Sequence, residues 1–141
     1  MNQNVEFKTL YRNIVSYAPN DDQPCGQTIQ DPGALLLLYA KIQLPFDENG
    51  NGQRTYHIPP YAPNFERETV IAVFQGTRFT TGYEVEITDI VETESNVLVK
   101  SKLSEPTDTL AGLTLTSPTH IVVCKKIEKR VRFEWKISNT D

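Results

Sequence analysis

The chain has 141 residues, of which 38% are hydrophobic and 23% are charged, and its formal net charge is -4. This composition fits one folded domain with a core and excludes a disordered chain. A general nucleic-acid-binding protein needs a basic surface for phosphates, which the net charge disfavours. No apolar run reaches the length of a membrane-spanning helix. We therefore expect neither a nucleic-acid nor a membrane partner.

The first half of the chain predicts a strand, a helix and a long loop. Residues 5–11 alternate loosely between apolar and polar side chains, as in a strand, which residues 13–17 extend. Residues 20–26 have the composition of a loop. Residues 46–63 are rich in Gly, Pro and Asn, and loops of this length are often functional.

The helix is predicted from its capping residues. Asp31 is placed as the N-cap and Pro32 at the first helical position. Pro45 stops the helix near Ile42 or Leu44. Its apolar face, which we expect to pack on a sheet, consists of Leu35, Leu36, Leu38, Tyr39 and Ile42.

The second half reads as consecutive strands, with turn residues between them. The predicted strands are residues 70–74, 81–92, 97–103, 120–124 and 130–136. The first is a continuous apolar run, which indicates a central strand covered on both faces. The alternation slips between Ile87 and Ile90, which predicts a bulge or bend. Short connections between consecutive strands favour antiparallel pairing.

These elements predict an α+β, mainly β fold. We expect an antiparallel curled sheet or a β-sandwich with one packed helix. Residues 1–141 form a single domain in this interpretation, because no internal repeat or linker divides them. Residues 1–67 supply a strand, the helix and the long loop, and residues 68–137 form the β-rich core.

Three segments of this core resemble the PrcB C-terminal domain family. They are residues 64–76, which end in Gly76, the Thr-Thr-Gly-Tyr turn and strand at residues 80–87, and the proline-led strand at residues 118–123. The resemblance extends over about residues 64–136. It implies a bacterial-type, non-catalytic accessory or interaction module, with a protease as one candidate protein partner.

The sequence departs from the family pattern at three positions. Thr81 stands where the family often has its first glycine, Phe79 replaces a common proline, and Asn64 replaces an aspartate. These changes leave the strand pattern intact.

The predicted partner-binding surface is centred on the same turn. It consists of Phe79, Thr80, Thr81, Gly82 and Tyr83, together with the adjoining long loop. The turn also resembles a loop of chagasin-like cysteine protease inhibitors, so a protease inhibitor is an alternative function. A purely structural interpretation stays open, because glycine supplies a turn and tyrosine caps a core.

A second alternative is weak calcium binding in residues 47–52. Asp47, Asn49 and Asn51 stand at alternate positions and Gly52 follows, as at the start of a calcium-binding loop. The twelfth position is Ile58, where such loops need a glutamate. A flexible turn without a bound ion is therefore the preferred interpretation of this segment.

The titratable residues do not form a catalytic pattern, so we expect no enzyme, no cofactor and no metal other than calcium in that loop. His120 and Cys124 lie four residues apart on one strand, about 13 Å along it, which is too far for a nucleophile and its base. The row Glu84, Glu86, Glu92 and Glu94 is placed opposite the apolar face, where Lys100 and Lys102 pair with it.

Compartment and assembly are less constrained. The N-terminus lacks the pattern of a secretion signal, so we expect a cytoplasmic chain, or a secreted or periplasmic one if a signal peptide was removed. Whether Cys25 and Cys124 pair, who the partner is, and the oligomeric state stay open.

Overall fold

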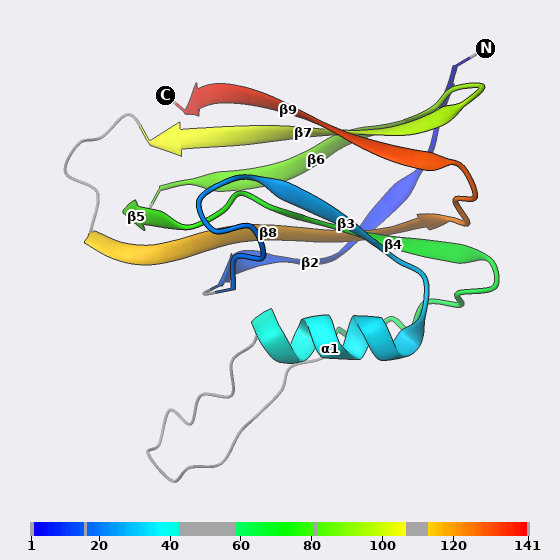
Figure 1. Ribbon diagram of the computed structural model, residues 1–141, viewed down its shortest axis with the longest axis horizontal. Coiled ribbons are helices and arrows are strands. Elements are labelled where there is room, and N and C mark those ends of the chain that lie inside the picture. Colours follow the sequence, from blue (N-terminus) through cyan, green and yellow to red (C-terminus); the bar gives the residue numbers. More distant parts are fainter. Residues whose placement is uncertain (1, 16, 43–58, 81, 107–112, 141) are drawn as a thin grey trace, which may run out of the picture.

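The computed structural model describes residues 2–15, 17–42, 59–80, 82–106 and 113–140. One helix and nine strands lie within these ranges, and Figure 1 labels all of them except β1. The elements are β1 (Gln3–Asn4), β2 (Phe7–Val15), β3 (Cys25–Ile29), α1 (Pro32–Ile42), β4 (Glu68–Phe74), β5 (Arg78–Thr80), β6 (Glu84–Glu92), β7 (Asn96–Pro106), β8 (Leu113–Lys125) and β9 (Arg130–Thr140).

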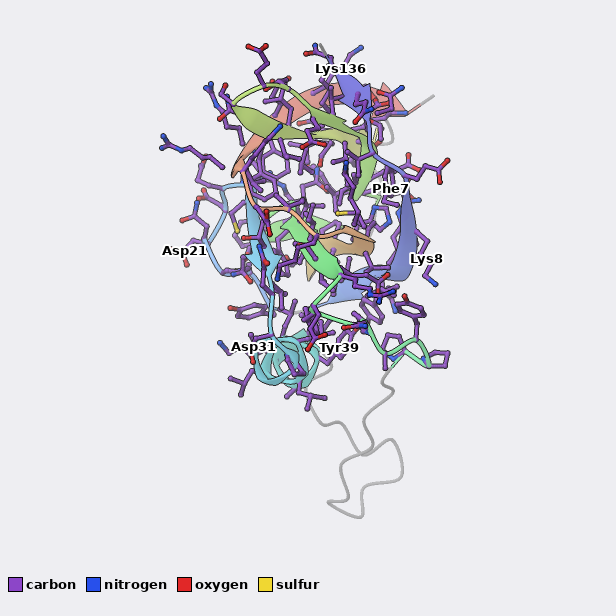
Figure 2. The ribbon with its side chains drawn as sticks, turned by 90° about the vertical axis from the view of Figure 1, so that its right-hand side faces the viewer. Phe7, Lys8, Asp21, Asp31, Tyr39 and Lys136 are labelled. Atoms are coloured by element: carbon purple, nitrogen blue, oxygen red, sulfur yellow. The ribbon has the colours of Figure 1, made fainter. Side chains whose placement is uncertain are left out.

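The strands form two sheets that are stacked on each other. The first sheet has the order β1-β6-β7-β9, and the second has the order β2-β8-β4-β3, with β5 paired to β8. Helix α1 covers the outer face of the second sheet (Figure 1). In the turned view, Lys136 lies at the top, on the first sheet (Figure 2). Asp31, directly before the helix, and Tyr39, on the helix, lie well below it. The predicted mainly β, α+β fold is therefore confirmed, in its β-sandwich form.

Two hydrophobic clusters hold the three layers together. Between the sheets, Ile71 and Val122 pack with Val85, Val99 and other residues of the first sheet. Between the second sheet and the helix, a second cluster contains Val70, Ala72, Phe74, Ile121, Val123, Leu35, Leu38, Tyr39 and Ile42. Alternate residues of β4 therefore enter different clusters, and the prediction of a strand buried on both faces is confirmed.

The helix begins as its capping residues predict. The Asp31 side chain accepts hydrogen bonds from the backbone N–H groups of Gly33 at 3.0 Å and Ala34 at 3.2 Å, which satisfies two amides of the first turn. The predicted apolar face is wrong at Leu36, which is exposed. The reason is that Leu35, Leu38, Tyr39 and Ile42 already fill the stripe against the sheet.

The strand pairing differs from the prediction at β9. Every other pair is antiparallel, but β9 runs parallel to β7. The physical reason is that β8 separates them in the chain and lies in the other sheet. The chain reverses after β8 and so returns to the first sheet in the direction of β7. Sequence reasoning also missed β3 and β5, which are short strands in segments that read as loops.

The predicted bulge is present. The register of β6 against β7 shifts between Ile87 and Asp89, so Thr88 and Asp89 are both exposed while Ile87 and Ile90 are both buried. Because the extra residue reverses the alternation, the predicted acidic row is wrong beyond this point. Glu92 lies opposite the buried Val97, on the inner side of the sheet.

Candidate functional site

The predicted partner-binding residues lie at one end of the sandwich, where β5, the end of β7 and the start of β8 come together (Figure 1). Gln75 follows β4 there and is almost completely buried. Its backbone N–H donates to the carbonyl of Pro118 at 3.0 Å, and its side-chain amide donates to the carbonyl of Ser104 at 3.3 Å. Gln75 thus ties the ends of β4 and β7 to the middle of β8.

The turn after Gln75 needs a glycine. Gly76 has a φ of +97°, and a Cβ atom there would lie 2.8 Å from the backbone carbon of Asp22. The next residue, Thr77, donates its N–H to the carbonyl of Asp21 at 2.8 Å. The loop before β3 and the turn before β5 are therefore held against each other through backbone atoms.

Arg78 fixes this contact with its side chain. Its two terminal nitrogens donate to the carbonyl of Asp22 at 3.2 Å and to the carbonyl of Gln75 at 3.1 Å. The guanidinium also lies 5.4 Å from the centre of the Tyr83 ring, within the range of a cation–π contact. These contacts fix the backbone before and around β5. We call the residues Gln75, Gly76, Thr77 and Arg78 the platform.

Phe79 projects from this platform into solvent. Phe79 is 69% exposed, which is the highest value among the large hydrophobic residues that the structure describes. The pairing of β5 with β8 matches Arg78 to Thr116 and Thr80 to Leu113, with an irregularity between the two pairs. Phe79 stands at that irregularity. Thr81 of the predicted surface lies outside the described residues.

Gly82 and Tyr83 lead back into the first sheet. Gly82 has a φ of +98°, and a Cβ atom there would lie 2.7 Å from Cβ of Pro106 at the end of β7. Both the backbone conformation and the close neighbour therefore require glycine. We call the described residues Phe79, Thr80, Gly82 and Tyr83 the tip.

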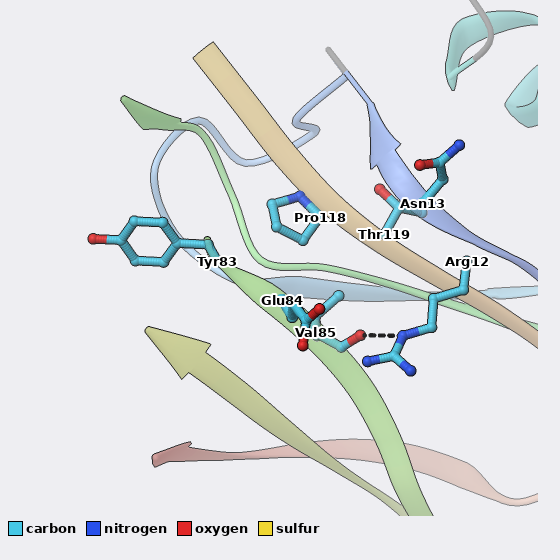
Figure 3. Close-up of a pocket in the computed structure, with 7 residues that line it drawn as sticks. All are labelled: Arg12, Asn13, Tyr83, Glu84, Val85, Pro118 and Thr119. Carbon is cyan, nitrogen blue, oxygen red and sulfur yellow. Dashed lines mark hydrogen bonds between the residues drawn. The ribbon is translucent and has the colours of Figure 1, made fainter. Parts of the chain in front are cut away.

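A pocket of about 320 Å³ adjoins the tip, between the edges of the two sheets. Its described lining is Arg12, Asn13, Tyr83, Glu84, Val85, Pro118 and Thr119. Figure 3 shows the Tyr83 ring extending away from Arg12. The lining offers a guanidinium, an amide, a carboxylate and hydroxyl groups. Groups of this kind can recognise a polar partner.

Arg12 covers the edge of β6 beside this pocket. Its Nε donates to the carbonyl of Val85 at 3.2 Å (Figure 3), and a terminal nitrogen lies 3.6 Å from the Glu86 carboxylate. In the described residues, β1 pairs with β6 only at Val91 and Glu92. On the edge of β6 that faces away from β7, Arg12 of the second sheet therefore bonds a stretch with which no described strand pairs. This contact limits the addition of another strand there.

The two imidazole nitrogens of His120 are both engaged. The residue is buried on β8, and its ring contacts the Thr9 hydroxyl at 2.8 Å and the Ile87 backbone N–H at 3.0 Å. Burial first, and then the charge of Arg12, lower its pKa to about 4. Through these contacts His120 joins β8 to β2 within the second sheet and to β6 of the first sheet.

The two cysteines are free and lie on opposite faces of the second sheet. Cys124 belongs to the cluster between the sheets, whereas Cys25 packs toward the helix. Burial raises the pKa of Cys124 to about 11 and also raises the pKa of Cys25. A raised pKa leaves little thiolate at neutral pH, so neither thiol is an activated nucleophile.

The acidic residues of β6 serve different partners. Glu92 lies 2.8 Å from Lys125 and 3.0 Å from Lys129, and these lysines lower its pKa. Glu86 stands opposite Lys102 in the ladder, as predicted. Glu84 is exposed. This division of roles fits ion pairing and solvent exposure instead of a pair of catalytic carboxylates.

The described end of the long loop lies away from the tip. The hydroxyl of Tyr61 donates to the carboxylate of Glu68 at 2.7 Å. The Lys8 ammonium lies 3.4 Å from the centre of the Tyr61 ring. Glu68 begins β4 while the tip follows its other end, about 20 Å along the strand. Residues 59–63 thus do not adjoin the tip, and residues 43–58 lie outside the described part.

Metal ligands do not gather in the described part of the chain: it holds no group of three or more His, Cys, Asp or Glu residues that could bind a metal ion. Asp47, Asn49 and Asn51, the predicted calcium ligands, lie outside that part. None of the described helices is long and apolar enough to cross a membrane.

The fold and site define a β-sandwich domain with a helix on one outer face and an exposed aromatic tip. Residues 69–125, from β4 to the end of β8, match the PrcB C-terminal family. The predicted resemblance is thereby confirmed for this segment, which is shorter than the predicted residues 64–136 and leaves out β9. Searches of curated proteins and of solved structures find no match to the chain. The likeness of the tip to chagasin-like inhibitors stays a prediction.

Sequence reasoning missed three residues that build the site. Arg12, Gln75 and Arg78 each join segments that are far apart in the chain. Gln75 carried a usable signal, since a polar residue directly follows the apolar run of β4 and precedes a glycine. Arg12 and Arg78 carried none, because their partners are backbone carbonyls of other segments.

Proposed function

We propose that this chain is a non-catalytic accessory domain that binds a component of a protease complex through the tip. The observation that carries the proposal is the exposure of Phe79, at 69%, on a platform held by Arg78. Because the segment before Phe79 is already held in place, binding has to order little more than a side chain with few rotatable bonds, which costs little conformational entropy. Aromatic residues also supply much of the binding energy at protein interfaces.

The match of residues 69–125 to the PrcB C-terminal family supports a component of a protease complex as the partner. That segment contains the whole tip, Pro106 against which Gly82 packs, and the strand β8 that pairs with β5. The engaged nitrogens of His120 and the raised thiol pKa values support a non-catalytic role.

Affinity capture with matched variants tests the proposal. Wild type, Phe79→Ser and Leu37→Ser are immobilised, and extract from the source cells is passed over each. Leu37 is a suitable control because it is 64% exposed and lies on the helix, away from the tip. We expect wild type and Leu37→Ser to retain a protease or a subunit of a protease complex, and Phe79→Ser to retain at least about tenfold less.

Equal retention of that protein by Phe79→Ser would contradict a role for the tip. Retention only of proteins unrelated to proteolysis would contradict the class of partner. Circular dichroism of each variant shows whether it is folded. The inhibitor alternative is separated by an activity assay with a papain-like protease: inhibition that Phe79→Ser abolishes would favour it, and no inhibition at micromolar protein would remove it.

A further inference from the structure

Strand β9 forms one edge of the first sheet, and this edge is unpaired among the described strands. It pairs with β7 along its whole length, from Arg130 to Thr140. It is the last strand in the order β1-β6-β7-β9, and no other described strand pairs with it. The backbone N–H and C=O groups on such an edge can pair with another strand. With 11 residues, β9 is a long template.

The side chains in the middle of β9 form a self-complementary pattern. Trp135 stands at the centre, with Glu134 before it and Lys136 after it. Phe133 and Ile137 flank these charges on the other face. Ile137 is 63% exposed, although it continues the row of Val131, Phe133 and Trp135 that packs against the core. When residues 133–137 are read in reverse, each charged position carries the opposite charge.

We propose that two copies of the chain pair their β9 strands antiparallel, about a two-fold axis at Trp135. The first sheet then continues from one copy into the other as a single eight-stranded sheet. Residues directly opposite each other in an antiparallel pair share a face and lie about 5 Å apart. Glu134 of each copy therefore meets Lys136 of the other, and Phe133 of each copy meets Ile137 of the other.

The charges select this register over its neighbours. Centring the pair on Glu134 or on Lys136 would oppose that residue to its own copy. Centring it on Phe133 would oppose Arg130 to Lys136. Like charges directly opposite each other are destabilising. Of the four centres from Phe133 to Lys136, only Trp135 gives opposite-charge pairs without a like-charge pair.

The neighbouring strand adds to this selection. Lys136 stands beside Lys102 of β7 in the ladder, and Glu134 stands beside Lys100. The two adjacent lysines repel each other within one copy. The second copy's Glu134 would lie on the far side of Lys136 and offset that repulsion. The exposed Ile137 would at the same time gain an apolar neighbour.

Charge reversal on the full chain tests the proposal. Sedimentation equilibrium from about 10 μM to about 1 mM detects dissociation constants into the millimolar range. We expect wild type to form a reversible dimer of 16.0 kDa chains. E134K and K136E each place like charges opposite each other twice, so each should weaken the dimer at least about tenfold. The double variant E134K/K136E restores both pairs and should dimerise like wild type.

Mixing the two single variants gives a sharper result. Both cross-strand pairs are attractive in a mixed dimer, so E134K and K136E together should form a heterodimer that neither forms with itself. E66K, a reversal at an exposed residue outside both sheets, should leave the dimer unchanged. A wild-type monomer at every concentration, or a dimer that both single reversals leave unaffected, would overturn the proposal.

Discussion

The backbone N–H of Ile87 donates a hydrogen bond to Nδ1 of His120 at 3.0 Å, and this bond joins the two sheets. Because Nδ1 accepts, Nε2 must carry the single proton of the neutral ring and donate it to the Thr9 hydroxyl, 2.8 Å away. Ile87 stands at the bulge of β6, so the histidine supplies a partner where the strand is irregular. The fold therefore depends on the neutral form of His120.

The first prediction is that acid weakens the fold through His120. The pKa of histidine is about 6.5 in an unfolded chain, and burial lowers that of His120 to about 4. Below pH 6.5 the unfolded chain binds a proton that the folded chain excludes. The free energy of unfolding therefore decreases as the pH is lowered from 6.5 toward 4. We expect a loss of about 2 to 3 kcal/mol between pH 7.5 and pH 4.5, measured by urea unfolding.

His120→Gln is the control for this measurement. Glutamine removes the titration, so the free energy of unfolding should change much less over the same pH range, even though the variant is less stable at pH 7.5. The pKa of Glu68 is lowered by its hydrogen bond with Tyr61 and that of Glu92 by Lys125 and Lys129. His120→Gln leaves these contacts in place, so the contribution of the two carboxyls is common to both proteins and cancels in the comparison. An equally steep pH dependence in His120→Gln would assign the effect to other groups.

The second prediction concerns the backbone of the tip. Gly82→Ala places a Cβ atom against Pro106 and forces alanine into a φ of +98°, so we expect a loss of about 1 to 3 kcal/mol in the free energy of unfolding. Phe79→Ala, three residues earlier, removes an exposed side chain and should change it by less than about 0.5 kcal/mol. Chemical denaturation of the two variants compares them directly, and equal stabilities would show that the turn tolerates a side chain.

Local signals in the sequence predicted the elements that depend on near neighbours in the chain. Asp31 and Pro32 placed the start of the helix correctly, because an N-cap bonds amides within three residues of itself. The slip in alternation at Ile87 placed the bulge, because the side chains of a strand alternate with a period of two. The buried run of β4 predicted a strand covered on both faces.

Contacts between distant segments could not be predicted in the same way. The parallel pairing of β9 with β7 follows from the sheet in which β8 lies, which no local pattern encodes. β3 was missed because its glycine and cysteine resemble a loop, although Gly26 makes room for the Phe133 ring. In the candidate site, Phe79, Gly82 and Tyr83 were predicted from the turn and the family resemblance. The roles of Arg12 and Arg78 depend on the whole fold.

The third prediction is that both thiols react slowly in the folded protein. Burial raises the pKa of Cys124 to about 11 and also raises that of Cys25. Since the thiolate is the reactive form, we expect Cys124 to react with a disulfide reagent only when the protein unfolds. Cys25, which is half-buried, should react more slowly than a free thiol. The Cys25→Ser variant isolates Cys124, and rapid labelling of it at neutral pH without denaturant would contradict its burial.

The fourth prediction concerns the contact between Gly26 and Phe133. A Cβ atom at Gly26 would overlap the Phe133 ring, which is held by stacking on Trp135 at 6.0 Å. Because the ring must shift to make room, Gly26→Ala should lower the free energy of unfolding by about 1 to 3 kcal/mol. Phe133→Leu alone should also destabilise the protein, through lost packing.

The double variant decides whether the overlap is the cause. If it is, Gly26→Ala should cost much less when residue 133 is already leucine, and a double-mutant cycle should give a coupling of about 1 kcal/mol or more. Additive losses would mean that Gly26 is required by the backbone of β3 and that Phe133 is not involved. A coupling of the expected sign would show that a glycine in one sheet sets the position of β9 in the other, and thereby the edge on which self-pairing of the chain depends.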